Sequence, residues 1–440
     1  MMPLVTALIA ALLAWLSPQP LTDRVTRDFE VSADGEAIAV VESGCARCDW
    51  GEAGREAAVL RVSLDGKYSQ HIALVHGEKV AKYPVVLGPL SKGSHRLIVE
   101  RDPELSAPGA GAATIAVPDV SVFRASQGGV FSAVSMAPIL YARPNTVGKF
   151  TDLPLVMWCE VMKTPRGRQY RYSVIFSNED GGTQTDRLMA TWGRTTDIEF
   201  VYGVELDQSG KVLAEEFQGP GHEVPAFKGQ HEARHPLLWV STDNNMVSES
   251  GPTRVRYRLE PQPFDLTDQA REAVMDANSW TYQIAAAEMR REGKIADDPP
   301  PGINKIPDPR RFVFVEACGT IGNAALSISV GSRQSRSALT WTPSDRGLPQ
   351  HRIVRDGCFT IATPLPAGTR AADVRAIRVQ AFERAPEKGA APAASNPVTL
   401  TRINKMFMLD DRFLPGRSIL EWTGSQTLRP GGDPFEVKVP

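Results

Sequence analysis

The stretch IRVQAFERAPE, residues Ile377–Glu387, has the alternating pattern of a β-strand. Ile377, Val379 and Ala381 alternate with side chains of other character, so they share one face of a pleated strand. Turn-forming proline and glycine residues lie on both sides and keep the element short. The pattern therefore predicts a β-strand with one buried face.

The same succession of strands and turns occurs near both ends of the chain. VVESGC (Val40–Cys45) is matched by FVEACG (Phe314–Gly319), and AAVLRVSLDG (Ala57–Gly66) is matched by AALSISVG (Ala324–Gly331). GPLSKGSHRLIVERDPE (Gly88–Glu104) is echoed by TPLPAGT (Thr363–Thr369) and then by Ile377–Glu387. Three matches in the same order favour a duplicated β-sandwich module over convergence on similar strand and turn sequences.

The chain is predicted to be mostly β, with two immunoglobulin-like β-sandwich modules flanking a central β-domain. The expected divisions are a signal peptide at 1–22, an N-terminal sandwich at 23–130, a central β-domain at 131–262, a helix and proline-rich linker at 263–309, and a C-terminal sandwich at 310–440. One long helix is predicted from Leu266 to Glu292, before the C-terminal module, because apolar residues recur there at helical spacing.

The charge balance argues against nucleic acid as a partner. The chain has 49 Lys and Arg residues against 51 Asp and Glu residues, a formal net charge of -2. Such a chain has no overall positive field to attract nucleic acid or an anionic membrane surface.

The N-terminus is predicted to be a signal peptide. An apolar run from Leu8 to Leu16 has the length of a signal-peptide core and is shorter than the roughly 20 residues that cross a bilayer as a helix. No basic residue precedes the run, so an uncleaved anchor or a short buried segment is the alternative. We expect a periplasmic or secreted protein without a membrane segment after signal removal.

The five cysteines indicate a disulfide-containing protein. Cys318 and Cys358 lie in two strand-like segments and are predicted to pair across one β-domain. Cys45 and Cys48 are interpreted as a loop disulfide, because the helix that activates a redox C-x-x-C motif is missing from the pattern. Cys159 lies in an apolar run and is expected to be the unpaired thiol.

The segment HEARH, residues 231–235, matches the H-E-x-x-H spacing of zinc peptidases. That spacing needs a helix, whereas Pro236 disfavours helical backbone at His235. A loop that enters a strand is therefore the favoured interpretation. The alternative is a metal-dependent hydrolase in which His222, His231 and His235 hold a divalent metal, or in which a histidine serves as general base.

A second polar cluster lies around the segment DIEFVYGVELD, residues 197–207. Alternation predicts that Asp197, Glu199 and Glu205 occupy the solvated face of a strand. The alternative is a catalytic pair, since two carboxylates on one strand face lie about 7 Å apart, within the range that glycosidases use. The preceding segment NEDGGT, residues 178–183, is interpreted as a hairpin turn, with a calcium loop as the alternative.

Aromatic rings beside acids and amides are the groups that bind sugars, although buried core aromatics are the ordinary interpretation. We predict that the site lies in the central domain. The candidate catalytic residues are His231, His235, Asp197 and Asp243, and the candidate ligand-binding residues are Trp192, Arg194, Tyr202, Asn244 and Asn245.

These patterns lead to one functional hypothesis and two alternatives. The hypothesis is an exported protein that binds or degrades an extracellular carbohydrate or polymer through its central domain, acting as a hydrolase or lyase if it is an enzyme. The alternatives are the metal-dependent hydrolase and a non-catalytic structural or adhesive surface protein. No cofactor other than that divalent metal is indicated.

Overall fold

The computed structural model describes residues 23–179, 181–333, 338–386 and 394–440. The predicted signal peptide, 1–22, lies outside the described residues. Strands account for 46% of the protein and helices for 12%, so the prediction of a mostly β protein is confirmed. The immunoglobulin-like arrangement of the modules stays a prediction.

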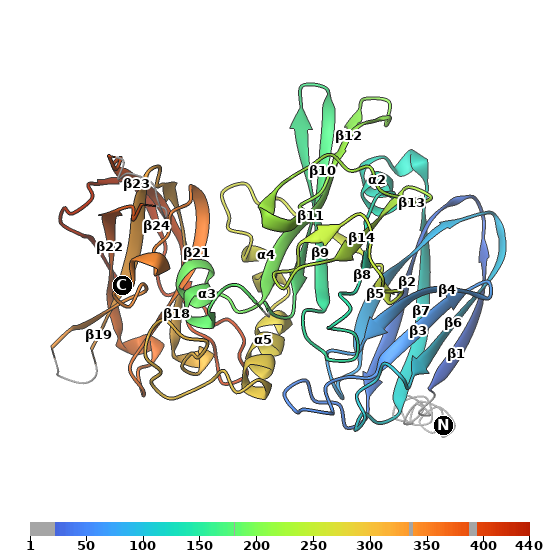
Figure 1. Ribbon diagram of the computed structural model, residues 1–440, viewed down its shortest axis with the longest axis horizontal. Coiled ribbons are helices and arrows are strands. Elements are labelled where there is room, and N and C mark those ends of the chain that lie inside the picture. The colour runs from blue at the N-terminus through green and yellow to red at the C-terminus, as the bar shows by residue number, and fades with distance from the viewer. Residues whose placement is uncertain (1–22, 180, 334–337, 387–393) are drawn as a thin grey trace, which may run out of the picture. The chain divides into compact units, whose positions relative to one another are not determined.

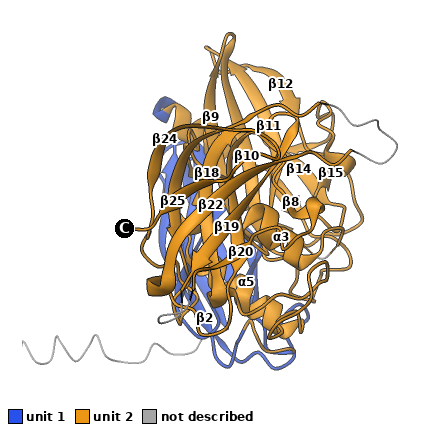
Figure 2. Ribbon diagram, turned by 90° about the vertical axis from the view of Figure 1, so that its left-hand side faces the viewer, with its two compact units in different colours: residues 1–49, 54–127 blue, residues 50–53, 128–440 orange. Residues whose placement is uncertain are grey.

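The chain divides into two compact units, shown in different colours in Figure 2. Unit 1 comprises residues 1–49 and 54–127, and unit 2 comprises residues 50–53 and 128–440. Each unit is built mainly from antiparallel sheets, labelled in Figure 1.

Unit 1 contains two antiparallel sheets. One has the order β1 (Arg24–Val31), β6 (Gly93–Asp102), β3 (Val59–Leu64), β4 (Lys67–Ala73), and the other has the order β5 (Ala81–Leu90), β2 (Gly35–Cys45), β7 (Ala113–Phe123). A short 3-10 turn, η2 (Ala125–Gln127), ends the unit. Alternate apolar residues such as Leu60 and Val62 on β3 are fully buried, as their spacing predicts.

The C-terminal part of unit 2 contains two antiparallel sheets with a corresponding strand order. Its sheets run β21 (Gly357–Pro364), β18 (Phe312–Thr320), β23 (Val398–Phe407), β24 (Trp422–Leu428) and β20 (Thr340–Pro343), β19 (Ala324–Ser332), β22 (Val374–Glu383), β25 (Phe435–Lys438). In chain order β2 to β7 therefore correspond one by one to β18 to β23. The repeated sequence thus has a counterpart in a repeated topology.

The central part of unit 2 contains two further sheets. The larger has the order β12 (Val212–Glu216), β11 (Asp197–Asp207), β10 (Gly167–Phe176), β9 (Pro154–Thr164), β17 (Pro261–Pro263). The smaller has the order β13 (His231–Glu232), β14 (His235–Val240), β8 (Ile139–Tyr141), β16 (Arg256–Tyr257), with β15 (Val247–Ser248) also paired to β14. The helices of unit 2 are α2 (Gly129–Ser135), α3 (Thr185–Trp192), α4 (Ala273–Ala277) and α5 (Trp280–Arg291).

The larger central sheet is buried on both faces. Tyr172 and Val204 belong to one apolar cluster shared with the smaller sheet. Trp158 and Ile198 belong to a second cluster, which contains residues of α4, α5, β18 and β23. Because the first part of β11 is covered on both faces, Asp197 and Glu199 have no solvated face to occupy, whereas Glu205 and Asp207 near its end are partly exposed.

The single long helix predicted from Leu266 to Glu292 is wrong in its extent. Residues 266–272 are not helical, and α4 and α5 are separated at Asn278 and Ser279. The Asn278 side-chain amide donates to the Val274 carbonyl at 3.0 Å. Such side-chain bonds compete with the helical backbone pattern, which is why asparagine interrupts helices.

All three cysteine predictions are confirmed. Cys318 and Cys358 are directly opposite partners on β18 and β21 and form a disulfide. Cys45 is bonded to Cys48, and Cys159 is a buried free thiol. Two disulfides are compatible with an oxidising compartment. Among the described residues, no helix has the length and apolar character needed to cross a membrane.

Candidate functional site

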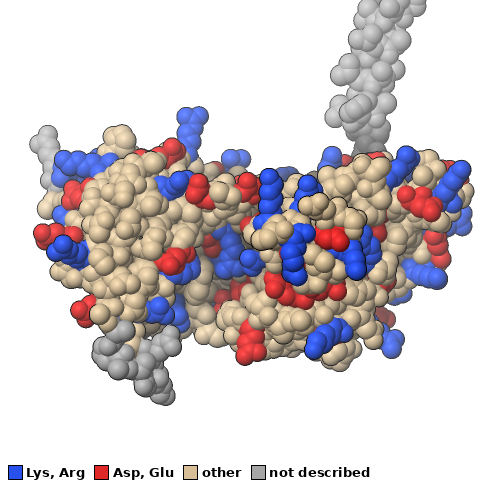
Figure 3. Space-filling model, turned by 90° about the horizontal axis from the view of Figure 1, so that it is seen from above, with Lys and Arg blue, Asp and Glu red and all other residues tan. Residues whose placement is uncertain are grey.

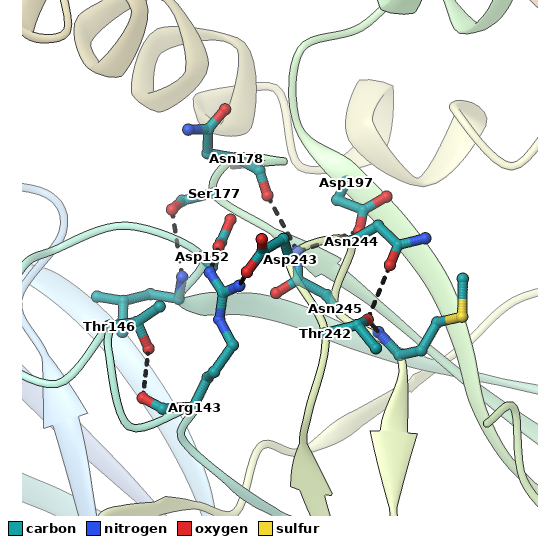
Figure 4. Close-up of polar contacts among 12 residues, drawn as sticks. Arg143, Thr146, Asp152, Ser177, Asn178, Asp197, Thr242, Asp243, Asn244 and Asn245 are labelled. Atoms are coloured by element: carbon teal, nitrogen blue, oxygen red, sulfur yellow. Dashed lines mark hydrogen bonds and ion pairs between the residues drawn. The ribbon is translucent and has the colours of Figure 1, made fainter. Parts of the chain in front are cut away.

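A buried hydrogen-bond network lies where β10 ends and β11 begins (Figure 4). The Asn245 amide nitrogen donates to Asp197 Oδ2 at 3.0 Å and to the Asn178 carbonyl at 3.1 Å. Asp197 is 2% exposed and Asn245 is fully buried. Asn245 has a φ of 54°, a left-handed conformation that asparagine tolerates better than most residues. The loop after β14 is thereby tied to the start of β11.

Arg194 supplies the positive charge of this network. Its Nε donates to Glu272 Oε1 at 3.0 Å, and its Nη1 lies 3.7 Å from Asp197 Oδ1. The guanidinium is almost fully buried, so its charge has to be shared with these two carboxylates rather than with water.

Glu199 lies two residues after Asp197 and is also buried. Its carboxyl group accepts a hydrogen bond from the Gln218 amide, whose nitrogen also lies 3.3 Å from His222 Nδ1. Burial and the neighbouring charge of Asp197 raise the pKa of Glu199 to about 8. The expectation of solvated carboxylates on β11 is therefore wrong for Asp197 and Glu199, because later parts of the chain cover the second face of the sheet.

Glu179 follows Asn178 in the loop after β10 and is half-buried. Burial and the charge of Asp197 raise its pKa to about 7, while a hydrogen bond with Thr183 opposes the shift. Burial also raises the pKa of Asp197, against the effect of Arg194 and Asn245. Three interacting carboxyl groups with raised pKa values retain protons at a pH where ordinary carboxyl groups have lost them.

Asp243 is a carboxylate of a different kind. Its side chain is 67% exposed and forms an ion pair with the buried Arg143, which also pairs with the buried Asp152 (Figure 4). A Cβ atom on Gly181 would lie 2.5 Å from Asp243 Cβ, so the loop that carries Glu179 packs directly against the loop of Asp243. We call Glu179, Asp197, Glu199 and Asp243 the carboxylate site.

Several candidates from the sequence thus lie in one region of unit 2. Asp197, Asp243, Arg194 and Asn245 belong to the network or adjoin it, and His222 reaches Glu199 through Gln218. The Asn244 side chain bonds within its own loop, accepting from Thr242 Oγ1 at 2.8 Å.

Four other candidates have different partners. Tyr202 donates to Glu215, which also pairs with His231 at 2.8 Å. His235 is buried, and its Nδ1 lies 2.8 Å from the Ala137 carbonyl. Trp192 is half-buried at the end of α3, with the Arg355 guanidinium 5.4 Å from its ring centroid.

The HEARH segment forms a hairpin rather than a helix. His231 lies opposite Pro236, and Glu232 lies opposite His235. Glu232 pairs with Arg256 and Arg258. Over the four described ranges, no group of three or more His, Cys, Asp or Glu residues is arranged to hold a metal ion. The H-E-x-x-H spacing therefore lies on a hairpin and not on a helix, as Pro236 predicts, and a metal held by His222, His231 and His235 stays a prediction.

Sequence reasoning missed part of this site. Glu179 was assigned only to a turn or calcium loop, and Arg143, Gln218 and Glu272 had no distinguishing pattern around them. The one available signal was the polar and glycine-rich segment 178–183, because loops on a β scaffold often carry functional groups.

Unit 1 has a pocket of about 530 Å³, lined by residues from β1, β6 and the turn at Asp65. Its lining residues are Asp28, Phe29, Glu30, Asp65, Ser94, His95 and Arg96. Its polar groups pair with one another: Arg96 with Asp28, His95 with Asp65, and Ser94 with Glu30. No residue of the carboxylate site lines this pocket.

Basic and acidic side chains are interspersed over the molecular face shown in Figure 3. This mixture agrees with the near balance of charges in the sequence.

Comparison with known proteins identifies no family. No family model and no curated protein matches the chain. A family two carbohydrate esterase from Clostridium thermocellum in complex with cellohexaose is 15% identical over 23% of this chain and 24% of its own, with a TM-score of 0.15. A ruminal GH26 endo-β-1,4-mannanase is 11% identical over 32% of this chain and 28% of its own, with a TM-score of 0.17.

A GH2 β-galacturonidase from Eisenbergiella tayi bound to glycerol is 14% identical over 46% of this chain and 28% of its own, with a TM-score of 0.15. The chain therefore spans only about a quarter of the length of these three structures. These weak structural neighbours are carbohydrate-active enzymes, but likeness at such TM-scores carries no argument about the function of this chain.

Proposed function

We propose that the protein is a glycoside-cleaving hydrolase whose active site is the carboxylate site of unit 2. One observation carries the proposal: Glu179, with a pKa raised to about 7, lies in a loop that packs against the loop of the arginine-paired Asp243. Glycoside hydrolysis by acid and base catalysis requires two carboxyl groups, one of which retains its proton.

The chemistry assigns one role to each of the two accessible groups. Protonated Glu179 donates its proton to the glycosidic oxygen as the bond to the anomeric carbon breaks. Asp243 accepts a proton from the water whose oxygen bonds to that carbon. Arg143 orients the Asp243 carboxylate, and burial together with the charge of the more deeply buried Asp197 raises the pKa of Glu179.

Of the earlier candidates, Asp197, Arg194 and Asn245 become groups that shape the site, and Asp243 becomes the proposed base. Export to the periplasm or exterior belongs to the same proposal, with two disulfides as its support.

The test is an activity assay on a panel of neutral and acidic polysaccharides and aryl glycosides. Glu179→Gln and Asp243→Asn are each expected to lower the rate by about 10²- to 10⁴-fold, the usual contribution of a general acid or base. Asp433→Asn, a change at an exposed carboxylate, is the matched control and is expected to retain full activity.

Two outcomes would contradict the proposal. One is the absence of cleavage across the panel by folded protein, including the case where a glycan binds without being cut. The other is a glycosidase activity that both substitutions leave unchanged.

A further inference from the structure

A second polar region of unit 2 lies between α3 and the C-terminal sandwich. Asp186 is on the first turn of α3, Arg346 follows β20, and His351 ends the 3-10 turn η5 (Pro349–His351). The backbone of Gly302 also belongs here, since its N–H donates to Asp186 Oδ2 at 2.5 Å. We call this region, defined by Asp186, Arg346 and His351, the junction chamber.

Four buried polar atoms in the junction chamber have no hydrogen-bond partner among the residues that the structure describes. They are Asp186 Oδ1, Arg346 Nη1 and both ring nitrogens of His351. His351 is fully buried, and the Asp186 side chain is 3% exposed. His351 Nε2 lies 3.9 Å from Asp186 Oδ1, which is too far for a direct hydrogen bond.

Isolated buried polar atoms of this kind are uncommon in folded proteins. The large majority are bonded to other protein groups or to ordered water. Four such atoms, from α3 and from the connection between β20 and β21, therefore indicate a common partner that no neighbouring side chain supplies.

The charges of the chamber favour a neutral partner. Asp186 and Arg346 carry opposite charges. Together they attract neither a cation nor an anion preferentially. Burial lowers the pKa of His351 against the attraction of Asp186 and Asp345, and Arg187 and Arg346 act in the same direction as burial. A neutral imidazole offers one donor and one acceptor, so the four atoms together need a molecule that both donates and accepts.

We propose that the junction chamber is a built site for ordered water, which links α3 to the C-terminal sandwich. Other contacts already hold this helix to the same neighbours: Arg355 donates to the Thr191 carbonyl at 2.6 Å, and the Thr185 N–H donates to Asn304 Oδ1 at 3.1 Å. The water completes this attachment at the first turn of α3. Because α3 directly follows the loop of Glu179, the site also positions that loop, but its existence does not depend on the proposed hydrolase activity.

The proposal is tested by whether His351→Leu raises or lowers the thermal stability of the protein. His351→Leu removes two groups that bind the water and leaves Asp186 and Arg346 with fewer partners, so the thermal midpoint of unit 2 is expected to fall. His351→Gln keeps a neutral donor and acceptor and is expected to lose clearly less. In a dry chamber the unpaired imidazole would be a pure cost, so a His351→Leu variant more stable than the natural protein would overturn the proposal.

A crystal structure of the full chain distinguishes bound water from a purely structural role of His351. Ordered density bridging His351 Nε2 and Asp186 Oδ1 is expected in the natural protein and is expected to be reduced or lost in His351→Leu. An empty chamber would overturn the proposal, as would stoichiometric metal in the purified protein that disappears in the variant.

Discussion

Glu199 shows how burial alone changes the behaviour of a common side chain. On an ordinary strand it would face water and lose its proton near pH 4.5, the reference value for glutamate. In this protein it lies beside Asp197 in a doubly covered sheet, and the pKa rises to about 8. Glu179, nearer the surface in the adjacent loop, shares the same neighbour and has an intermediate value. The raised pKa values of Glu179 and Glu199 therefore share two causes, burial and the charge of Asp197.

This difference predicts a pH dependence of stability. Between about pH 4.5 and about pH 8 the unfolded chain has lost the Glu199 proton while the folded protein still holds it. The folded protein binds more protons in that window, so the free energy of unfolding contributed by this group falls as pH rises through it.

Glu199→Gln is expected to flatten that part of the pH profile, because a neutral amide does not titrate. Urea unfolding midpoints measured from pH 5 to pH 8.5 provide the test, with Asp433→Asn as the control that leaves the slope unchanged. An equal slope in Glu199→Gln would show that the raised pKa has another origin or is absent.

At the scale of the elements, the site depends on two loops rather than on one strand. The loop after β10 and the loop after β14 meet at Gly181 and Asp243, and Asn245 bonds the second loop to both Asn178 and Asp197. β10 and β14 belong to different sheets that share one apolar cluster, so the meeting of these loops depends on the packing of the two sheets rather than on the sequence of either loop.

Gly181→Ala tests this contact. The added methyl group would lie 2.5 Å from Asp243 Cβ, a separation that forces the two loops apart. Glycosidase activity is expected to fall at least tenfold while the fold is retained, since a displacement of about 1 Å in catalytic groups costs as much as 10²-fold in rate.

Gly129→Ala is the matched control, because a Cβ atom there would make only an ordinary contact at 3.9 Å with the Tyr170 hydroxyl. Equal activity of the two variants would contradict the idea that close packing of the loops sets the catalytic geometry.

At the scale of the whole molecule, the two compact units contain one disulfide each. Cys318 and Cys358 of unit 2 are 40 positions apart in the sequence, whereas Cys45 and Cys48 of unit 1 are only 3 positions apart. A cross-link stabilises mainly by restricting the unfolded chain, and the effect grows with the length of the closed loop.

Replacing Cys318 and Cys358 together by alanine is therefore expected to destabilise unit 2 by about 4 kcal/mol, compared with about 2 kcal/mol for unit 1 in the Cys45→Ala, Cys48→Ala variant. Calorimetry of the two variants measures both transitions. A larger loss from the short loop than from the long one would contradict this entropic account.

Elements that depend on local pattern could be predicted from the sequence. Alternation of apolar residues predicted strands such as β22, and the repeated segments predicted two modules that turn out to share one strand order. Cys318 and Cys358 could be paired because each lies in a strand of the same module. Pro236 likewise argued correctly against a helix at HEARH.

The helix predicted from Leu266 shows the limit of local pattern. The periodicity of apolar residues does not reveal the hydrogen bond from the Asn278 side chain that separates α4 from α5.

The mostly β character was determined by the sequence itself, because strand alternation and turn chemistry act over a few neighbouring residues. The arrangement of the carboxylate site was decided only by tertiary structure. Asp197 and Glu199 alternate as in a surface strand, yet their cross-strand neighbours Phe176 and Val174 belong to the apolar cluster shared with the smaller central sheet, which covers that face. Burial, and with it the pKa of a carboxyl group, depends on segments distant in the chain, and no local pattern carries that information.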